Sequence, residues 1–135
     1  MPVDFAMFVA EAESSMNAQE SSEIKLRCAI SRAYYGTYHL ALSYADTIAL
    51  PAISDCAGPT HRKLSAFFEG SMDKDRAVRL RLKKIGYVLK QLHESRVTAD
   101  YRLDESVSQE DAESFMIRSS ATRSEIEFLK SPAAA

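Results

Sequence analysis

The sequence has few of the residues that interrupt regular structure. Its 135 residues include 4 Gly and 4 Pro, and this scarcity favours a few long elements over many short strands. There is no tryptophan, and the only cysteines are Cys28 and Cys56. Two sulfurs at this spacing match no metal-binding pattern and allow at most one disulfide. We expect two free thiols in a reducing compartment.

Strong net charge and long hydrophobic runs are also missing. The formal net charge of −2 excludes a strongly basic coat for nucleic acid, so any RNA contact must come from a local patch. No stretch approaches the about 18 apolar residues of a membrane-spanning helix. The N-terminal MPVDFAMFVAEAE has acidic residues where a signal peptide needs an apolar run. The sequence therefore predicts a cytoplasmic protein without membrane contact.

The chain is long and apolar enough to form one domain with its own core, since 46% of its residues are hydrophobic. Apolar residues recur every three or four positions, which predicts helices. We expect an all-α, up-and-down antiparallel bundle of about five helices in a single domain, residues 1–130, followed by a disordered tail at 131–135. The expected helices cover 3–16, 18–48, 61–70, 73–96 and 108–129.

Local signals set the expected helix boundaries. Asn17 with Glu20 is predicted to cap the second helix, and Ser108 with Asp111 to cap the last one. Residues 97–107 are expected to form a loop. Gly36 interrupts the second helix, and because glycine costs about 1 kcal/mol there, we expect a close helix crossing at this residue. In the fourth helix Leu80 is expected on the buried stripe.

The segment SRAYYGTYH, residues 31–39, holds the first candidate site. Arg32 and His39 lie seven residues apart and share a helix face, with Cα atoms about 10.5 Å apart. Histidine can take a proton from an RNA 2′-hydroxyl and arginine can hold the phosphate, so this pair is the candidate catalytic pair. The alternative is structural. Arg32 would then bond Asp100 or Tyr101 and pin the second helix to the end of the fourth, and His39 would be a packing residue.

Other polar residues have two interpretations as well. His93 and Arg96 lie one turn apart and form either a binding pair or a solvated helix end. His61 is expected to be a packing or cap residue. The tyrosines of 31–39 are either core residues or platforms for RNA bases. The cationic stripe Arg76, Arg79 and Lys83 either tracks a phosphate backbone or faces solvent. No metal site and no cofactor are predicted.

Three blocks of the sequence together resemble the HEPN domain (higher eukaryotes and prokaryotes nucleotide-binding). RCAISRAYYGTYHLAL is similar to its Ser-Arg-Ala-Tyr-Tyr helix, and THRKLSAFFEG to its His-then-Phe segment. LKQLHESRVTADYRLDESVSQEDAESF is similar to its Arg-x-x-Ala-Asp-Tyr segment and the following capped helix. The blocks occur in the family's order and span residues 22–129.

The resemblance implies a helical bundle, often dimeric, in toxin–antitoxin, defence or RNA-processing systems. Many HEPN proteins are metal-independent ribonucleases with a histidine four to six residues after an arginine, and others are non-catalytic partners of small nucleotidyltransferases. Arg96 lies in the matching block, but no histidine follows it at that spacing.

This departure favours a non-catalytic module that binds a nucleotidyltransferase partner or a nucleotide. The alternatives are a metal-independent ribonuclease, and a homodimeric structural or regulatory protein without a ligand. The candidate binding residues are Arg96, His93, Asp100, Tyr101 and Tyr35.

Overall fold

The computed structural model describes residues 2–17 and 22–131. These residues form five α-helices and one short 3-10 helix, η1, and they contain no strand. The predicted all-α class is therefore confirmed. Apart from Ser131, the predicted tail lies outside the described residues. The elements are α1 (Phe5–Met16), α2 (Glu23–Ile48), η1 (Ile53–Asp55), α3 (Thr60–Glu69), α4 (Arg76–Tyr101) and α5 (Gln109–Lys130).

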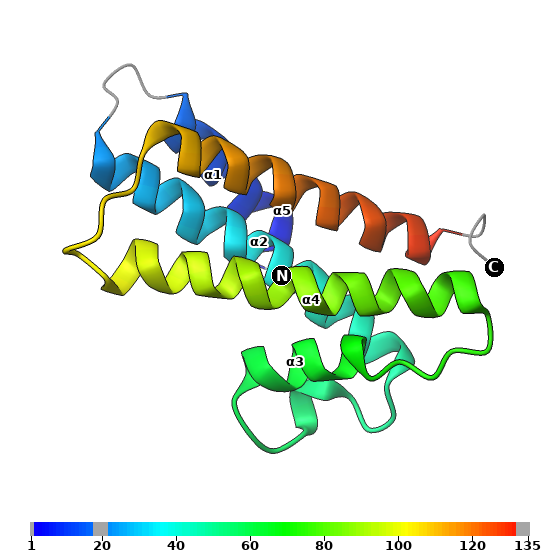
Figure 1. Ribbon diagram of the computed structural model, residues 1–135. Coiled ribbons are helices and arrows are strands. Elements are labelled where there is room, and N and C mark those ends of the chain that lie inside the picture. The colour runs from blue at the N-terminus through cyan, green and yellow to red at the C-terminus, as the bar shows by residue number, and fades with distance from the viewer. Residues whose placement is uncertain (1, 18–21, 132–135) are drawn as a thin grey trace.

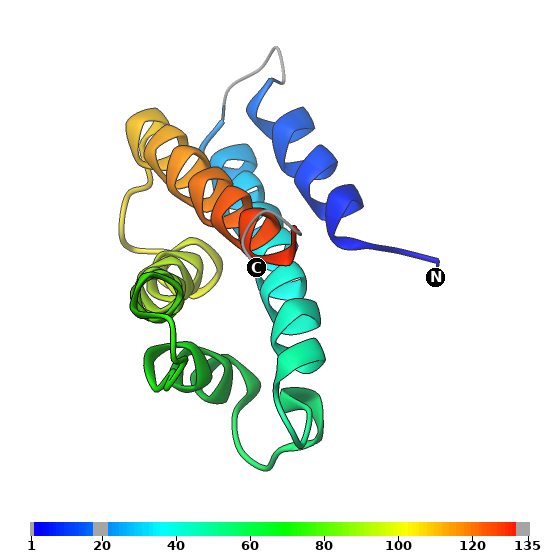
Figure 2. The same ribbon diagram turned by 90° about the vertical axis from the view of Figure 1, so that its right-hand side faces the viewer.

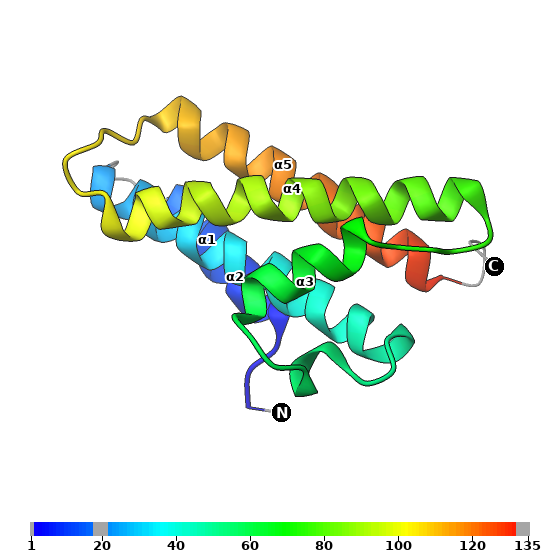
Figure 3. The same cartoon turned by 60° about the horizontal axis from the view of Figure 1, so that its bottom comes forward.

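The long helices run in alternating directions, and α2 lies at the centre of the bundle (Figure 1). Helix α1 covers one side of α2, while α4 and α5 form a layer on the other side (Figure 2). The short α3 packs against α4 and the C-terminal half of α2 (Figure 3). Apolar side chains from all five helices join one core. Its largest fully buried members are Tyr34, Leu40, Leu64, Phe68, Leu92 and Ile126.

Side chains cap the N-termini of three of these helices, α1, α4 and α5. The Ser108 side chain accepts the Asp111 N–H, and the Asp111 carboxylate accepts the Ser108 N–H, so the predicted capping box of α5 is confirmed. Asp75 accepts two backbone N–H groups at the start of α4, and Asp4 accepts one at the start of α1. No helix in the described parts of the chain is both long and apolar enough to cross a membrane.

Three local predictions were wrong. Asn17 closes α1 by donating its N–H to Glu13, whereas α2 begins at Glu23; the other predicted cap residue, Glu20, lies outside the described residues. Helix α4 continues to Tyr101 and so includes the first five residues of the predicted loop, because Ala99 is buried against the core, while residues 102–107 are non-helical as predicted. Leu80 is 52% exposed and does not belong to the buried stripe.

Two glycines allow neighbouring helices to approach α2 and α4 closely. A Cβ on Gly36 would lie 2.8 Å from Cγ2 of Val9 in α1, which confirms the predicted crossing. A Cβ on Gly86 in α4 would lie 2.8 Å from the backbone N of Glu69 and 2.8 Å from the carbonyl O of Ser65. Helix α3 therefore packs backbone to backbone against α4, and this contact fixes its position.

We expect Gly86→Ala to lower the free energy of unfolding by about 1–2 kcal/mol, because the new methyl group meets backbone atoms that cannot rotate away. The better helix propensity of alanine offsets part of this cost. Gly36→Ala is the matched comparison and should lose less unfolding free energy, since the closest contact of the new methyl group is a side-chain methyl of Val9. Denaturant unfolding of both variants tests this order, and a Gly86→Ala protein as stable as wild type would contradict it.

Candidate functional site

Two histidines meet where α3 packs against α4. The rings of His61 on α3 and His93 on α4 have centroids 4.6 Å apart. The ring of Tyr38 on α2 lies 4.6 Å from that of His61, and the Tyr34 hydroxyl lies 2.5 Å from Nδ1 of His61. Three helices thus place aromatic and imidazole rings in one group. We call Tyr34, Tyr35, Tyr38, His61, His93 and Arg96 the histidine–tyrosine cluster.

Arg96 supplies the positive charge of the cluster. Its guanidinium carbon lies 5.1 Å from the ring centroid of Tyr35 and 5.2 Å from that of Tyr101. Its Nε donates to the Asp100 carboxylate over 2.8 Å, and the same carboxylate oxygen accepts the Ser31 hydroxyl over 3.0 Å. Two rings and one carboxylate therefore orient this guanidinium.

An open pocket of about 440 Å³ lies beside the two histidines, between α3 and α4. His61 and His93 form part of its wall, and Arg62 and Lys90 add two positive charges. Glu94 is the acidic residue of the lining, and Lys90 is also paired with Glu69 over 3.0 Å. The wall of this pocket thus holds two cationic residues and one acidic residue, and one of the cations is already paired.

The electrostatics of the cluster keep its histidines neutral at pH 7. Burial, together with the smaller effect of positive charge on His93, Arg96 and His39, lowers the pKa of His61 to about 4. Burial and the nearby Arg96 also lower the pKa of His93. Burial raises the pKa of the Tyr34 hydroxyl, which stays protonated. A bound anion would offset the repulsion between these groups and raise both histidine pKa values.

The structure does not place Arg32 in the structural role predicted for it, a bond from α2 to the end of α4. Arg32 is exposed on α2 and lines a shallow pocket against α1, together with Met7, Phe8 and Glu11. The expected bond from Arg32 to Asp100 is wrong, since Asp100 is bonded by Ser31 and Arg96 instead.

His39 lies at the edge of the cluster and is exposed. Its ring centroid is 5.2 Å from that of Phe8, 5.2 Å from that of Tyr38 and 6.1 Å from that of Tyr35, and the partial loss of water contact beside these rings lowers its pKa. His39 and Arg32 line different pockets, and Phe8 belongs to both walls. The proposed catalytic pair is therefore divided by an aromatic side chain of α1.

Arg27 has the structural role that the sequence analysis gave to Arg32. Its side chain is 5% exposed and reaches from α2 to the C-terminal end of α4. Nη1 donates to the carbonyl oxygens of Thr98 and Ala99, both over 3.0 Å, and to that of Arg102 over 3.3 Å. Nη2 donates to the Glu105 carbonyl. One guanidinium therefore satisfies the last turn of α4 and the loop that follows it.

Sequence reasoning gave His61 no part in the site, although its ring contacts four other members of the cluster, Tyr34, Tyr35, Tyr38 and His93. The available signal was the position of His61 in the second of the three blocks, THRKLSAFFEG. The five candidate binding residues do come together: Tyr35, His93, Arg96, Asp100 and Tyr101. No group of three His, Cys, Asp or Glu side chains within the described residues could hold a metal ion.

The two cysteines take no part in the cluster. Both are free thiols, as expected, with Cys28 exposed on α2 and Cys56 half-buried after η1. Comparisons of the chain with protein-family models, with curated proteins and with solved structures gave no match.

Proposed function

We propose that the protein is a HEPN-like, non-catalytic module that binds the phosphate of a nucleotide or of RNA at the histidine–tyrosine cluster. The observation that carries this proposal is the placement of Arg96, which two rings and Asp100 orient one helical turn from His93, a residue of the pocket wall that also holds Arg62 and Lys90. Guanidinium groups bind phosphate through paired, charge-assisted hydrogen bonds. Preorientation lowers the entropy cost of binding.

Tyr101 adds a surface for a nucleobase. Its side chain is 69% exposed and lies against the guanidinium of Arg96. Bases of single-stranded nucleic acid stack on exposed aromatic rings next to cations, with about 1–3 kcal/mol per base. A phosphate on Arg96 and a base on Tyr101 would together select a nucleotide over free phosphate.

The resemblance to HEPN domains supports this proposal, because the residues that carry the resemblance lie together in the structure. Residues from all three blocks that carry the resemblance meet in the cluster: Tyr34 and Tyr35 from the first, His61 from the second, and His93 and Arg96 from the third. A nucleotidyltransferase partner and a role in a toxin–antitoxin or defence system are part of the same proposal. A nucleotidyltransferase gene next to the gene for this chain would support them.

Fluorescence anisotropy with a labelled single-stranded RNA of about ten nucleotides, in EDTA, tests the binding function. We expect saturable binding that weakens steeply as salt rises, because phosphate contacts release counterions. Competition with a nucleoside monophosphate should displace the RNA. Absence of binding by both ligands at low salt would contradict the proposal.

Metal-independent RNA cleavage is the second candidate function, and the contact between His61 and His93 favours it. Two imidazoles can serve as the general base and the general acid of phosphodiester cleavage. Two features favour binding instead. Ring centroids only 4.6 Å apart leave no room for a phosphate between them, and a pKa of about 4 makes His61 a weak base.

Incubation of the same RNA in EDTA separates the two functions. We expect the RNA to remain intact. Cleavage that persists in wild type and disappears in both His61→Gln and His93→Gln would establish the ribonuclease function in place of the binding function.

A further inference from the structure

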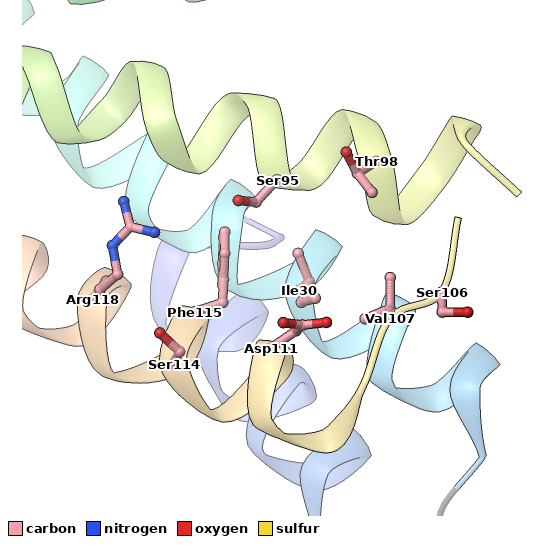
Figure 4. A pocket seen from close by; sticks show the side chains of 9 residues that line it. All are labelled: Ile30, Ser95, Thr98, Ser106, Val107, Asp111, Ser114, Phe115 and Arg118. Atoms are coloured by element: carbon pink, nitrogen blue, oxygen red, sulfur yellow. The ribbon is translucent and has the colours of Figure 1, made fainter. Parts of the chain in front are cut away.

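A hollow of about 310 Å³ lies between α4 and α5, and α2 closes it from behind (Figure 4). This volume is at the lower end of the range of small-ligand pockets. The buried side chains of Ile30 and Phe115 form an apolar base, and the hydroxyl groups of Ser95, Thr98 and Ser114 lie along the walls. None of these residues lines the pocket beside the two histidines. We call this second site the serine-lined hollow.

The serine-lined hollow has one charged side chain of each sign. Asp111 and Arg118, both on α5, lie toward its two ends, with the ring of Phe115 between them (Figure 4). They are seven residues apart, so their Cα atoms are about 10.5 Å apart along the helix. An ion pair within one helix needs a spacing of three or four residues, and these two charges therefore do not neutralise each other.

Arg118 has no acidic partner in the described parts of the chain. Its Nη2 donates over 2.6 Å to the neutral side-chain amide of Gln91 on α4. Glu125, which lines an adjoining hollow with Arg118, is paired with Arg81 over 2.5 Å. The guanidinium of Arg118 therefore keeps its full positive charge.

Two hydroxyl groups lie near this guanidinium. Ser114 precedes Arg118 by one turn of α5, and Ser95 follows Gln91, the partner of Arg118, by one turn of α4. A guanidinium together with two hydroxyl donors is suited to bind a carboxylate.

Asp111, at the other end, has no cationic partner within the described residues. Its Oδ2 accepts the Ser108 N–H over 2.9 Å as part of the α5 cap. Hydrogen bonding with Ser108 lowers the pKa of Asp111, so this carboxylate is ionised at pH 7. The two ends of the hollow thus carry opposite charges, and neither is compensated by the protein.

The loop between α4 and α5, which forms one end of the hollow, is held in place by α2. Val107 lies in the wall and is 6% exposed, and its N–H donates to the Glu23 carboxylate over 3.0 Å. Arg27 donates to the Glu105 carbonyl in the same loop. The shape of the hollow therefore exists before a ligand binds, which lowers the entropy cost of binding.

We propose that the serine-lined hollow binds a linear zwitterion, an ω-amino carboxylic acid, with its carboxylate at Arg118 and its ammonium group at Asp111. The methylene chain between these groups lies on the apolar base formed by Phe115 and Ile30. An amino acid with adjacent charges, such as glycine, reaches only one of the two ends. A phosphate at Arg118 would meet the negative charge of Asp111 in the same hollow, and a neutral sugar would match neither charge.

An NMR titration of the full chain with ε-aminocaproate, up to about 10 mM, tests this site. We expect saturable shifts of the backbone amides of Ser95, Thr98 and Ser114. Caproate, n-hexylamine and glycine should each bind about tenfold or more weakly, because each engages only one end of the hollow. Absence of saturable shifts with ε-aminocaproate would overturn the proposal, and so would equal binding of caproate or n-hexylamine.

Two variants assign the ends of the ligand. Asp111→Asn keeps an oxygen that can cap the Ser108 N–H, and it should lower the affinity for ε-aminocaproate about tenfold while leaving that for caproate unchanged. Arg118→Gln should lower it about tenfold as well, while leaving the affinity for n-hexylamine unchanged. Unchanged affinity of either variant for ε-aminocaproate would overturn the proposal.

Glu113→Gln and Lys130→Gln are the matched controls, because they remove one charge of each sign from exposed residues of α5 outside the hollow. Both should bind ε-aminocaproate like wild type. Equal losses in the controls would show that the overall charge of the helix, and not the hollow, sets the affinity. A neutral hexose that bound as tightly as ε-aminocaproate would assign the hollow to sugars instead.

Discussion

Arg27→Ala is expected to lower the free energy of unfolding by about 3 kcal/mol or more and the melting temperature by roughly 10 °C. The substitution removes the donor for four backbone carbonyl groups, those of Thr98, Ala99, Arg102 and Glu105. Water cannot replace it freely, because the Arg27 side chain is 5% exposed. Glu23, which pairs with Arg27 and accepts the Val107 N–H, would lose its own partner as well.

Thermal unfolding followed by circular dichroism measures this effect. Arg32→Ala is the matched control, five residues later on the same helix, and should leave the melting temperature nearly unchanged because Arg32 is exposed. Arg27→Lys should recover only part of the loss, since an ammonium group lacks the planar fork that reaches several carbonyls at once. Equal losses in Arg27→Ala and Arg32→Ala would show that Arg27 does not join α2 to the end of α4.

The second large effect concerns ligand affinity. We expect Arg96→Ala to weaken binding of the labelled RNA at least about thirtyfold, because the ligand phosphate would lose its charge-assisted hydrogen bonds. Tyr101→Ala should weaken it about tenfold through lost base stacking. The Tyr101 ring is 69% exposed, so its removal should leave the fold intact.

Arg32→Ala again serves as the control, since it removes one positive charge outside the cluster and should change the affinity little. If Arg32→Ala and His39→Ala abolished binding while Arg96→Ala and Tyr101→Ala did not, the ligand site would lie between α1 and α2 instead. Circular dichroism of each variant separates a loss of contact from a loss of fold.

Much of the fold could be predicted from sequence because its signals are local. The three- and four-residue spacing of apolar side chains indicated the helices, and the Ser108–Asp111 pair marked the start of α5. The extent of α4 could not be predicted in this way. Residues 97–101 stay helical because Ala99 packs in the core and Arg27, far away in sequence, caps the end of the helix.

The site was predicted only in part, for a related reason. Arg27 and Arg32 are five residues apart, which places them on different faces of α2, and the sequence alone does not say which face meets α4. Tyr35, His93, Arg96, Asp100 and Tyr101 were named as binding residues from the sequence blocks, and their side chains do lie together, whereas their binding of a ligand stays a prediction. The position of His61 in the cluster depends on how closely α3 packs on α4. That close packing requires glycine at position 86, because a Cβ there would meet the backbone of α3.

The titration of the His61 and His93 imidazoles by NMR, with and without a nucleoside monophosphate, tests the central claim most directly. Without the ligand, His61 should remain neutral down to a pH of about 4. With it, the pKa values of both rings should rise, because a phosphate held beside Arg96 stabilises the protonated imidazoles. Two histidines that titrate near 6.5 and do not respond to the nucleotide would contradict a phosphate site in the cluster.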